Sequence, residues 1–241
     1  MKELEDYHWF PDFIRCYQAE FIGSITCWLN IYKPIVPEIE KLIIENRSDL
    51  IQDLCSGSGI PADYIRKHGK KLPRFILSDK YPQPFLKNKF YLPASVDVLD
   101  FQPDTNTCYT MFNAFHHFSD EQKRDIIEKI LKARTSFVFV EILQPGLLTM
   151  LRVVITSTIL QLMTAPFIKP FSWARLFFTY IIPVNIFTVL YDGIISVFRS
   201  RLFSRYRSMF EKLTNSNYKV SVEKVTSWKT TLISIKGTTI Q

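Results

Sequence analysis

The sequence predicts an α/β protein built on a doubly wound, mostly parallel sheet. Apolar runs alternate with amphipathic segments from about residue 50 to residue 142, which is the pattern of strands joined by crossover helices. The first run also leads into a small-residue loop with Gly57 and Gly59, and a helix is expected to follow. A strand, a glycine loop and a helix N-terminus together form a cradle for a nucleotide-like ligand.

Each core element has a local signal. Apolar or alternating runs predict seven strands, over residues 50–55, 74–79, 90–98, 108–115, 136–142, 218–225 and 230–235. Pro61 fits the first turn of a helix after the glycine loop, where a missing N–H group costs nothing. Ser119 and Gln122 have the spacing of a capping box, which predicts a helix reaching about residue 133.

The chain divides into a core and two additions. Residues 1–48 are expected to form an N-terminal helical cap, with Pro11 and Pro37 opening two helices. These helices cover either the cradle or one sheet edge, and the sequence leaves both readings open. Residues 49–142 and 216–241 are expected to form the ligand-binding core, with 143–215 inserted before the last two strands.

The insertion is unusually apolar. Residues 146–168 contain a single charge, Arg152, and residues 176–198 contain a single charge, Asp192. Each run is long enough to span a bilayer, but prolines interrupt the insertion at positions 166, 170 and 183. We therefore expect short helices that pack over the site as a lid, with an outer face in peripheral contact with a membrane.

Charge and cysteine content narrow the class of protein. The net charge is +7, and four arginines cluster late in the chain, at Arg199, Arg201, Arg205 and Arg207. They suit a phosphate-rich surface or anionic lipid, or form a solvated helix face. Nucleic acid is not expected as a partner. The four cysteines have no C-x-x-C spacing and no histidine at zinc-like spacing, so no metal site is expected.

The chain start and the scattered cysteines bear on location. The N-terminal six residues are acidic and lack an apolar stretch, so they do not read as a secretory signal. Single cysteines fit a reducing compartment. A cytoplasmic protein at the inner face of the membrane is therefore expected.

The glycine loop fits more than one ligand. Residues 57–62 match G-x-G-x-x-A, and Asp79 follows Gly59 by 20 residues, as in dinucleotide sites. Asp53, inside the first strand, instead favours a cationic ligand such as a sulfonium amino acid, unless it caps the loop amides. An NAD-dependent reductase therefore stays an alternative.

The segment Asp53-Leu54-Cys55-Ser56-Gly57-Ser58-Gly59 resembles motif I of class I S-adenosylmethionine (SAM)-dependent methyltransferases, D/E-x-G-x-G-x-G, with Cys55 in place of the first glycine. The resemblance implies a Rossmann-like sheet in the order 3-2-1-4-5-7-6 and SAM as cofactor. It implies that Asp79 holds the ribose hydroxyls and that Asp97 lies near the adenine amino group. The full implied cofactor set is Asp53, Cys55, Ser56, Gly57, Gly59, Asp79, Lys80, Asp97, Val98 and Asn113. Residues 179–183 and 192–199 further resemble a bacterial subgroup of these proteins.

The acceptor side is less defined. His116 and His117 follow the fourth predicted strand and are candidates for a general base. In the structural alternative, one of them packs on a phenylalanine and the other caps a backbone carbonyl. Glu141, at the end of the fifth predicted strand, is expected to contact either the substrate or a helix N-terminus. Asp192 is expected at the site or in an ion pair with Arg199 or Arg152. The candidate substrate residues are Phe115, Glu141, Tyr180, Asp192 and Arg199.

The hypothesis from sequence is SAM-dependent methyl transfer to a small apolar or lipid-like acceptor. A non-catalytic, membrane-associated binding protein on a methyltransferase scaffold is the main alternative. Methyl transfer needs little from side chains, because the sulfonium already carries its leaving group and catalysis is mostly alignment.

Overall fold

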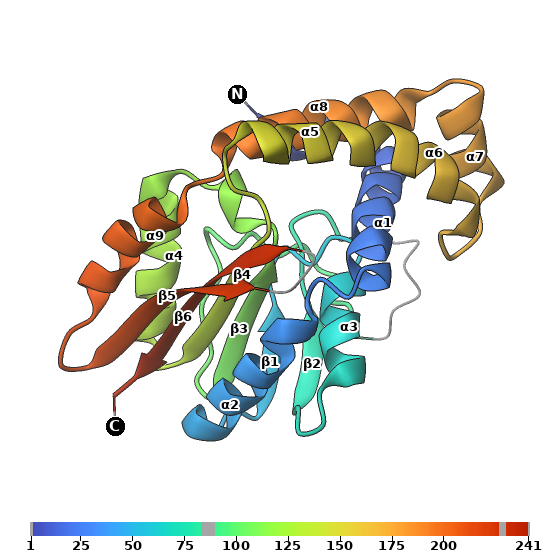
Figure 1. Cartoon of the computed structure of the whole chain (residues 1–241). Coiled ribbons are helices and arrows are strands. Elements are labelled where there is room, and N and C mark those ends of the chain that lie inside the picture. Colours follow the sequence, from blue (N-terminus) through green and yellow to red (C-terminus); the bar gives the residue numbers. More distant parts are fainter. Residues whose placement is uncertain (1, 83–89, 227–229, 241) are drawn as a thin grey trace.

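A six-stranded sheet forms the centre of the protein, of which the computed structural model describes residues 2–82, 90–226 and 230–240 (Figure 1). The strands are β1 (Leu50–Asp53), β2 (Arg74–Leu77), β3 (Thr107–Phe112), β4 (Ser136–Glu141), β5 (Tyr218–Thr226) and β6 (Thr231–Thr239). Their order is β2-β1-β3-β4-β6-β5. Strands β1 to β4 are parallel, and β6 is antiparallel to both neighbours. The predicted α/β class is confirmed.

The strand predicted around residues 90–98 is reduced to one parallel bridge between Leu77 and Tyr91. The Leu77 N–H donates to the Phe90 carbonyl (2.9 Å) and the Leu92 N–H donates to the Leu77 carbonyl (2.8 Å). Further along, the Val96 N–H donates to the carbonyl of Asp79, which follows β2 (2.9 Å), so the segment stays beside β2 without forming a regular strand. The described residues therefore form six strands, where the sequence predicted seven.

Helices cover both faces of the sheet. They include α1 (Asp12–Trp28), α2 (Val36–Asn46), α3 (Ile60–His68), α4 (Asp120–Lys132) and α9 (Phe203–Phe210). Strand side chains alternate between two cores: Tyr109 and Met111 pack with α4 and α9, whereas Cys108 and Phe112 pack with α2 and α3. The capping box that opens α4 is present, because Ser119 accepts from the Gln122 N–H and Gln122 accepts in return.

The chain between β4 and β5 forms a layer of helices that we call the lid. It consists of α5 (Leu147–Ile155), a π turn (Thr156–Leu160), α6 (Gln161–Thr164), α7 (Trp173–Tyr180) and α8 (Val184–Arg199). The lid lies across the top of the molecule, beside the N-terminal end of the chain (Figure 1). Gly193 lets α5 and α8 approach closely, because a Cβ atom there would lie 2.7 Å from Val153 Cγ1.

A buried ion pair ties the lid to the N-terminal helices. Arg175 of α7 contacts Glu20 of α1 at 2.7 Å, and both side chains are nearly inaccessible. Arg175 also donates to the carbonyls of Ile168 (2.6 Å) and Pro170 (2.8 Å). Arg175 is thus part of the protein interior, so the lid packs on α1 instead of extending away from the core.

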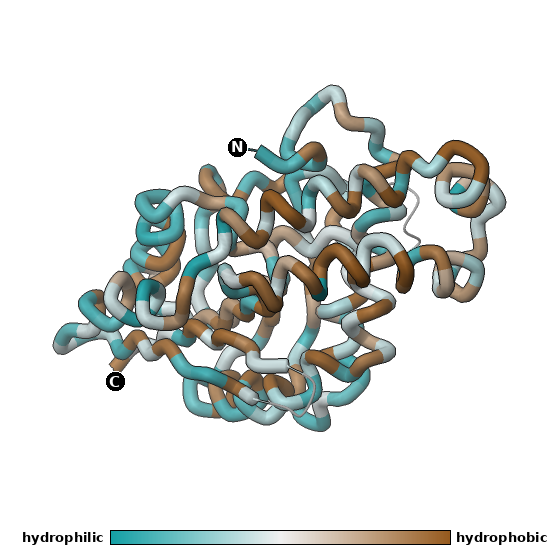
Figure 2. The backbone as a smooth tube through the Cα atoms, turned by 45° about the horizontal axis from the view of Figure 1, so that its top comes forward, coloured by the Kyte–Doolittle hydropathy of each residue, from teal (hydrophilic) through white to brown (hydrophobic). Residues whose placement is uncertain are grey.

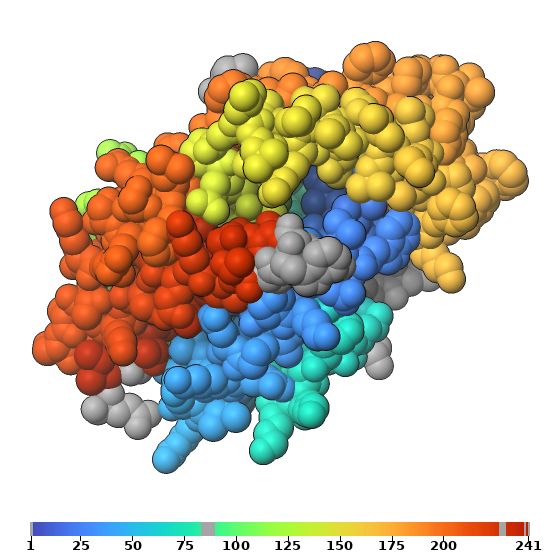
Figure 3. Space-filling model, viewed as in Figure 1, coloured from blue at the N-terminus to red at the C-terminus, as the bar shows by residue number. Residues whose placement is uncertain are grey.

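The outer face of the lid is apolar. Figure 2 shows hydrophobic stretches along its helices, and Figure 3 shows its side chains on the outside of the molecule next to α1. The largest exposed fractions are those of Leu147 (88%), Trp173 (78%), Phe167 (69%), Ile181 (69%), Phe198 (67%), Phe187 (66%) and Met163 (66%). By length and composition, Leu147–Phe167 is apolar enough to cross a membrane. The bent pair Trp173–Tyr180 and Val184–Arg199, at 75°, would be a second such element if it were one span.

Candidate functional site

The glycine loop follows β1 and leads into α3. Three of its residues adopt a left-handed backbone: Cys55 (φ 53°), Gly57 (φ 50°) and Gly59 (φ 69°). Helix α1 rests directly on this loop, because a Cβ atom on Gly23 would lie 2.8 Å from Ser58 Oγ. Helix α1 therefore lies over the loop, whereas α2 packs against the sheet, so each of the two placements that the sequence left open applies to one helix.

Asp79 follows β2 and faces the loop. Its Oδ2 accepts from the Gly57 N–H and its Oδ1 accepts from the Tyr81 N–H, both at 2.8 Å. Burial raises the pKa of Asp79, and these two bonds oppose the rise. Next to it, Lys80 Nζ contacts Asp97 Oδ2 at 2.7 Å. Partial burial of Asp97 opposes its ionisation, but the Lys80 bond outweighs burial and lowers the pKa of Asp97.

Asp53 does not line the cavity. It is 2% exposed at the end of β1, and its Oδ1 accepts from Thr110 Oγ1 at 2.7 Å. Burial raises the pKa of Asp53 to about 7. Its carbonyl also accepts from the hydroxyls of Ser56 and Ser78, both at 2.9 Å. The structure thus makes Asp53 a support beneath the loop, in place of the ligand contact that the sequence favoured.

A cavity of about 1020 Å³ lies between the strand ends and the lid. Its floor includes the loop residues Cys55, Ser56 and Gly57, the acids Asp79 and Asp97 with Lys80 and Val98, and Asn113 after β3. Its roof comes from α5 and α8, through Thr149, Arg152, Val153, Val189, Asp192 and Ser196. The cavity therefore joins nearly all of the predicted cofactor residues to the apolar insertion, except Asp53 and Gly59.

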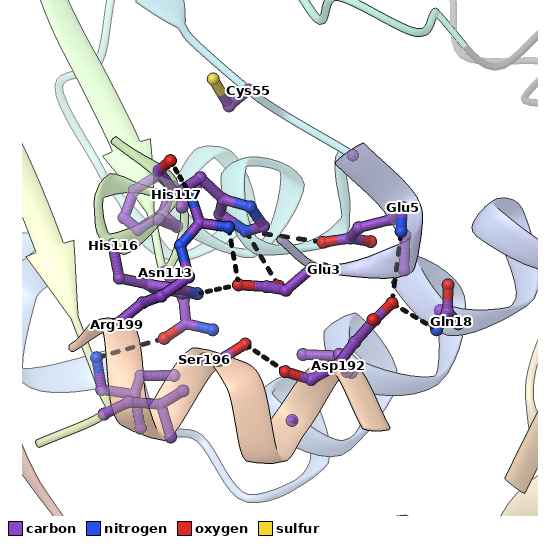
Figure 4. A pocket seen from close by; sticks show the side chains of 18 of the residues that line it. Glu3, Glu5, Gln18, Cys55, Asn113, His116, His117, Asp192, Ser196 and Arg199 are labelled. Atoms are coloured by element: carbon purple, nitrogen blue, oxygen red, sulfur yellow. Dashed lines mark hydrogen bonds and ion pairs between the residues drawn. The ribbon is translucent and has the colours of Figure 1, made fainter. Parts of the chain in front are cut away.

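His116 and His117 lie at one end of this cavity, in the turn Phe115–His117 (Figure 4). Glu141, fully buried at the end of β4, contacts His116 Nδ1 at 2.8 Å and accepts from the Phe115 N–H at 2.7 Å. His116 is 2% exposed. Glu141 therefore orients His116 from behind, while the other ring nitrogen, Nε2, is left for the cavity side.

The N-terminal segment, residues 2–6, fills the space beside the two histidines. Glu3 Oε1 lies 3.8 Å from His116 Nε2, and Glu3 Oε2 lies 3.5 Å from His117 Nε2. His117 Nδ1 contacts Asp6 Oδ1 at 3.0 Å. Burial opposes protonation of His117, but Glu3, Asp6 and Glu5 outweigh it and raise its pKa to about 10.

Asp192 and Arg199 of α8 both line the cavity, and both hold the N-terminal segment. Asp192 accepts from the backbone N–H groups of Leu4 (2.5 Å) and Glu5 (3.4 Å). Arg199 contacts Asp6 Oδ2 at 2.6 Å. Asp192 is thus at the cavity, and its hydrogen bonds go to the N-terminal segment and Gln18 in place of an ion pair with Arg199 or Arg152. Burial raises the pKa of Asp192 to about 6.

Three candidate substrate residues are not brought to the cavity wall. Phe115 is fully buried and packs with Phe139 and Phe210 in the core. Glu141 lies behind His116, as described above. Tyr180 is 45% exposed on α7, and its hydroxyl donates to the Leu162 carbonyl.

The N-terminal acids are the site residues that sequence reasoning missed. Glu3, His116 and His117 bring one ligand atom each to within 4.8 Å of one another, a group that can hold a metal ion. The sequence search for metal ligands considered local spacings, whereas Glu3 is more than 110 residues from the histidines. The acidic run at the chain start was the available signal.

Comparison with known proteins gives the fold. No family model matches the chain, and no curated protein matches its sequence. Among solved structures, human N-acetylserotonin methyltransferase in complex with SAM aligns over 86% of this chain and 52% of its own, with 13% identity and a TM-score of 0.50. Mitomycin 7-O-methyltransferase MmcR aligns over 91% of this chain and 55% of its own, with 12% identity and a TM-score of 0.50.

The plantazolicin methyltransferase BpumL, in complex with a monoazolic desmethylPZN analog and SAH, covers 93% of this chain and 89% of its own, with 10% identity and a TM-score of 0.56. This chain thus spans about half the length of the first two proteins and most of the third. At identities of 10–13%, the three alignments show a similarity of fold alone. The chain has the class I SAM-dependent methyltransferase fold.

Proposed function

We propose that the protein is a SAM-dependent methyltransferase whose acceptor is a small apolar or lipid-like molecule. The single observation that supports this most is the cavity of about 1020 Å³, which runs from the glycine loop and Asp79 to His116 beneath an apolar lid. Its size suits a cofactor together with a small acceptor. Ligands of doubly wound sheets bind at this edge, outside the carboxyl ends of the strands.

The residues of the cofactor end fit SAM. The left-handed loop at Gly57 and Gly59 brings backbone close to the cavity. Asp79 suits the two ribose hydroxyls, since each carboxylate oxygen keeps a lone pair beyond the one used by Gly57 or Tyr81. Asp97 and Val98 are expected at the adenine, and Asn113 near the methyl-transfer site.

Bound SAM supplies a methyl group on a positively charged sulfur. This chain's residues bind the reactants, exclude water beneath α5 and α8, and hold the acceptor in line. When the acceptor is a hydroxyl compound, His116 Nε2 takes its proton. Glu141 then stabilises the imidazolium through Nδ1, as an orienting carboxylate does for a general base. The N-terminal segment has to shift for such an acceptor to reach His116, because Glu3 lies against it.

The lid is proposed to rest on a membrane surface, from which an apolar acceptor enters. Exposed side chains such as Leu147, Trp173 and Phe187 form its outer face. The arginine cluster contributes less than its charge indicates, since its members are in ion pairs: Arg199 with Asp6, Arg201 and Arg205 with Asp120, and Arg207 with Glu211. Vesicle binding should therefore depend weakly on salt.

Calorimetric titration with SAM and with SAH, followed by transfer of a labelled methyl group to a lipid extract, tests this function. We expect binding of both and label in the organic phase. Binding without transfer would favour a non-catalytic protein on this scaffold, and quenching of NADH fluorescence would favour the reductase. Flotation with neutral vesicles, compared with a Leu147→Ser and Trp173→Ser variant, tests the membrane contact. Equal flotation of the two would contradict it.

A further inference from the structure

Four acidic or imidazole side chains from two distant segments converge at the acceptor end of the cavity. Glu3 and Glu5 come from the N-terminal segment, and His116 and His117 come from the turn after β3 (Figure 4). The imidazole Nε2 atoms face the carboxylates: His116 to Glu3 at 3.8 Å, His117 to Glu3 at 3.5 Å, and His117 to Glu5 at 3.5 Å.

We propose that Glu3, His116 and His117 form a binding site for a divalent transition-metal ion, with Zn²⁺ the best match to their chemistry. Two histidines and one glutamate are a ligand set that zinc takes, and such a set leaves a fourth position for water or substrate. Glu5 Oε1 also lies 3.5 Å from His117 Nε2. Binding of the ion does not depend on methyl transfer, although it uses the nitrogen that the proposed function assigns as the base.

The separations fit coordination better than direct hydrogen bonding. Distances of 3.5 and 3.8 Å exceed the normal range of a hydrogen bond between nitrogen and oxygen. Two ligands of a tetrahedral ion with bonds of about 2.05 Å lie about 3.4 Å apart. A small approach of the three side chains toward a common centre is therefore enough to ligate an ion.

Each histidine is oriented as a metal ligand. His116 Nδ1 contacts Glu141 at 2.8 Å, and His117 Nδ1 contacts Asp6 at 3.0 Å. A carboxylate on one ring nitrogen fixes the tautomer and turns the other nitrogen toward the ion, which is the arrangement of carboxylate–histidine–zinc sites. Both Nε2 atoms thereby face Glu3.

Glu3 is a buried carboxylate with one oxygen that has no hydrogen-bond partner within the described residues. Its side chain is about 2% exposed, and the oxygen is Oε1. Arg199 Nη1 forms an ion pair with this oxygen at 3.5 Å, beyond the usual hydrogen-bond distance. Five carboxylates gather around this point, namely Glu3, Glu5, Asp6, Glu141 and Asp192. A divalent ion would satisfy the orphaned oxygen and offset part of this negative charge.

A bound ion would occupy His116 Nε2. Metal-free protein would use that nitrogen as the base, whereas loaded protein would hold the acceptor oxygen at the fourth position and lower its pKa. Bound metal would also fasten the N-terminal segment to the core through Glu3, and so would raise the unfolding temperature.

Calorimetry of chelator-treated protein with Zn²⁺ alone tests the site, with Mn²⁺ and Fe²⁺ in parallel. We expect one ion per chain and a higher unfolding temperature with Zn²⁺. Glu3→Gln keeps the shape of the side chain, and His117→Ala removes one ligand; each should weaken binding at least tenfold. His68→Ala is the matched control, because His68 lies on α3 with its Nδ1 at the Tyr64 carbonyl, 2.8 Å away.

Absence of heat and of thermal stabilisation with all three ions would overturn the proposal. So would binding by Glu3→Gln equal to that of the wild type, which would place the ion elsewhere. If His117→Ala does not fold, Glu3→Gln still decides, since near-ultraviolet circular dichroism reports its folding. SAH titration of the same samples separates this outcome from that of the methyltransferase proposal.

Discussion

Replacing Asp79 with alanine should weaken SAM binding strongly. The carboxylate lines the cavity and holds the loop through Gly57 and Tyr81 at 2.8 Å each. A hydrogen bond to a charged group contributes about 1.5–3 kcal/mol. Loss of two such bonds to the ribose therefore removes at least about 3 kcal/mol, which corresponds to a dissociation constant raised by about 150-fold.

Loosening of the loop contributes to the same loss, because the Gly57 N–H also loses its acceptor. Calorimetric titration of wild type and Asp79→Ala measures the total effect, and urea unfolding measures the part due to stability. Asp125→Ala is the matched control, since Asp125 is exposed on α4 and lies outside the cavity lining. A dissociation constant within threefold of the wild type for Asp79→Ala would refute the reasoning.

Three further predictions concern stability, each followed by urea unfolding. Cys55→Gly should stabilise the protein by about 1 kcal/mol, because Cys55 has a φ of 53°, which costs a non-glycine residue about 1–2 kcal/mol; a loss of stability would show that the Cys55 contacts outweigh this strain. Asp53→Asn should remove a pH dependence: the pKa of Asp53 is raised from 3.8 to about 7, so wild-type stability falls as pH rises from about 4 to 7. The free energy of unfolding of the variant, relative to that of the wild type, should therefore rise by up to about 4 kcal/mol between pH 4 and pH 8. A difference between the two proteins that does not change with pH would contradict this. Arg175→Met should cost about 3–5 kcal/mol by leaving Glu20 buried without its partner, whereas Glu20→Gln with Arg175→Met should cost less; equal costs would show that the pair is not coupled.

Local signals predicted much of the core. The capping residues Ser119 and Gln122 place the start of α4 at Asp120, and Pro61 lies in the first turn of α3, as expected. These signals succeed because capping and proline geometry act within one turn of the chain. The strand predicted at 90–98 is reduced to the single bridge between Leu77 and Tyr91, because its apolar run does not reveal how much of it pairs with β2.

The candidate site was only partly predictable. The glycine loop and Asp79 meet because strands β1 and β2 are adjacent and parallel, which the βαβ pattern already implies. Asp53 was misjudged because its position in a strand does not reveal whether a strand end faces the cavity or a neighbour such as Thr110. Tyr180 lies on α7, whose distance from the cavity depends on how the lid folds back.

The sequence by itself determined the α/β class, the loop after β1 and the apolar character of the lid, because each depends on composition or spacing within a short window. Only the tertiary structure brought Glu3 to His116 and His117, and Arg175 to Glu20. These contacts join residues more than 100 positions apart, and no local pattern specifies them. They form because burying the lid and the N-terminal segment leaves charged groups that must find partners inside the protein.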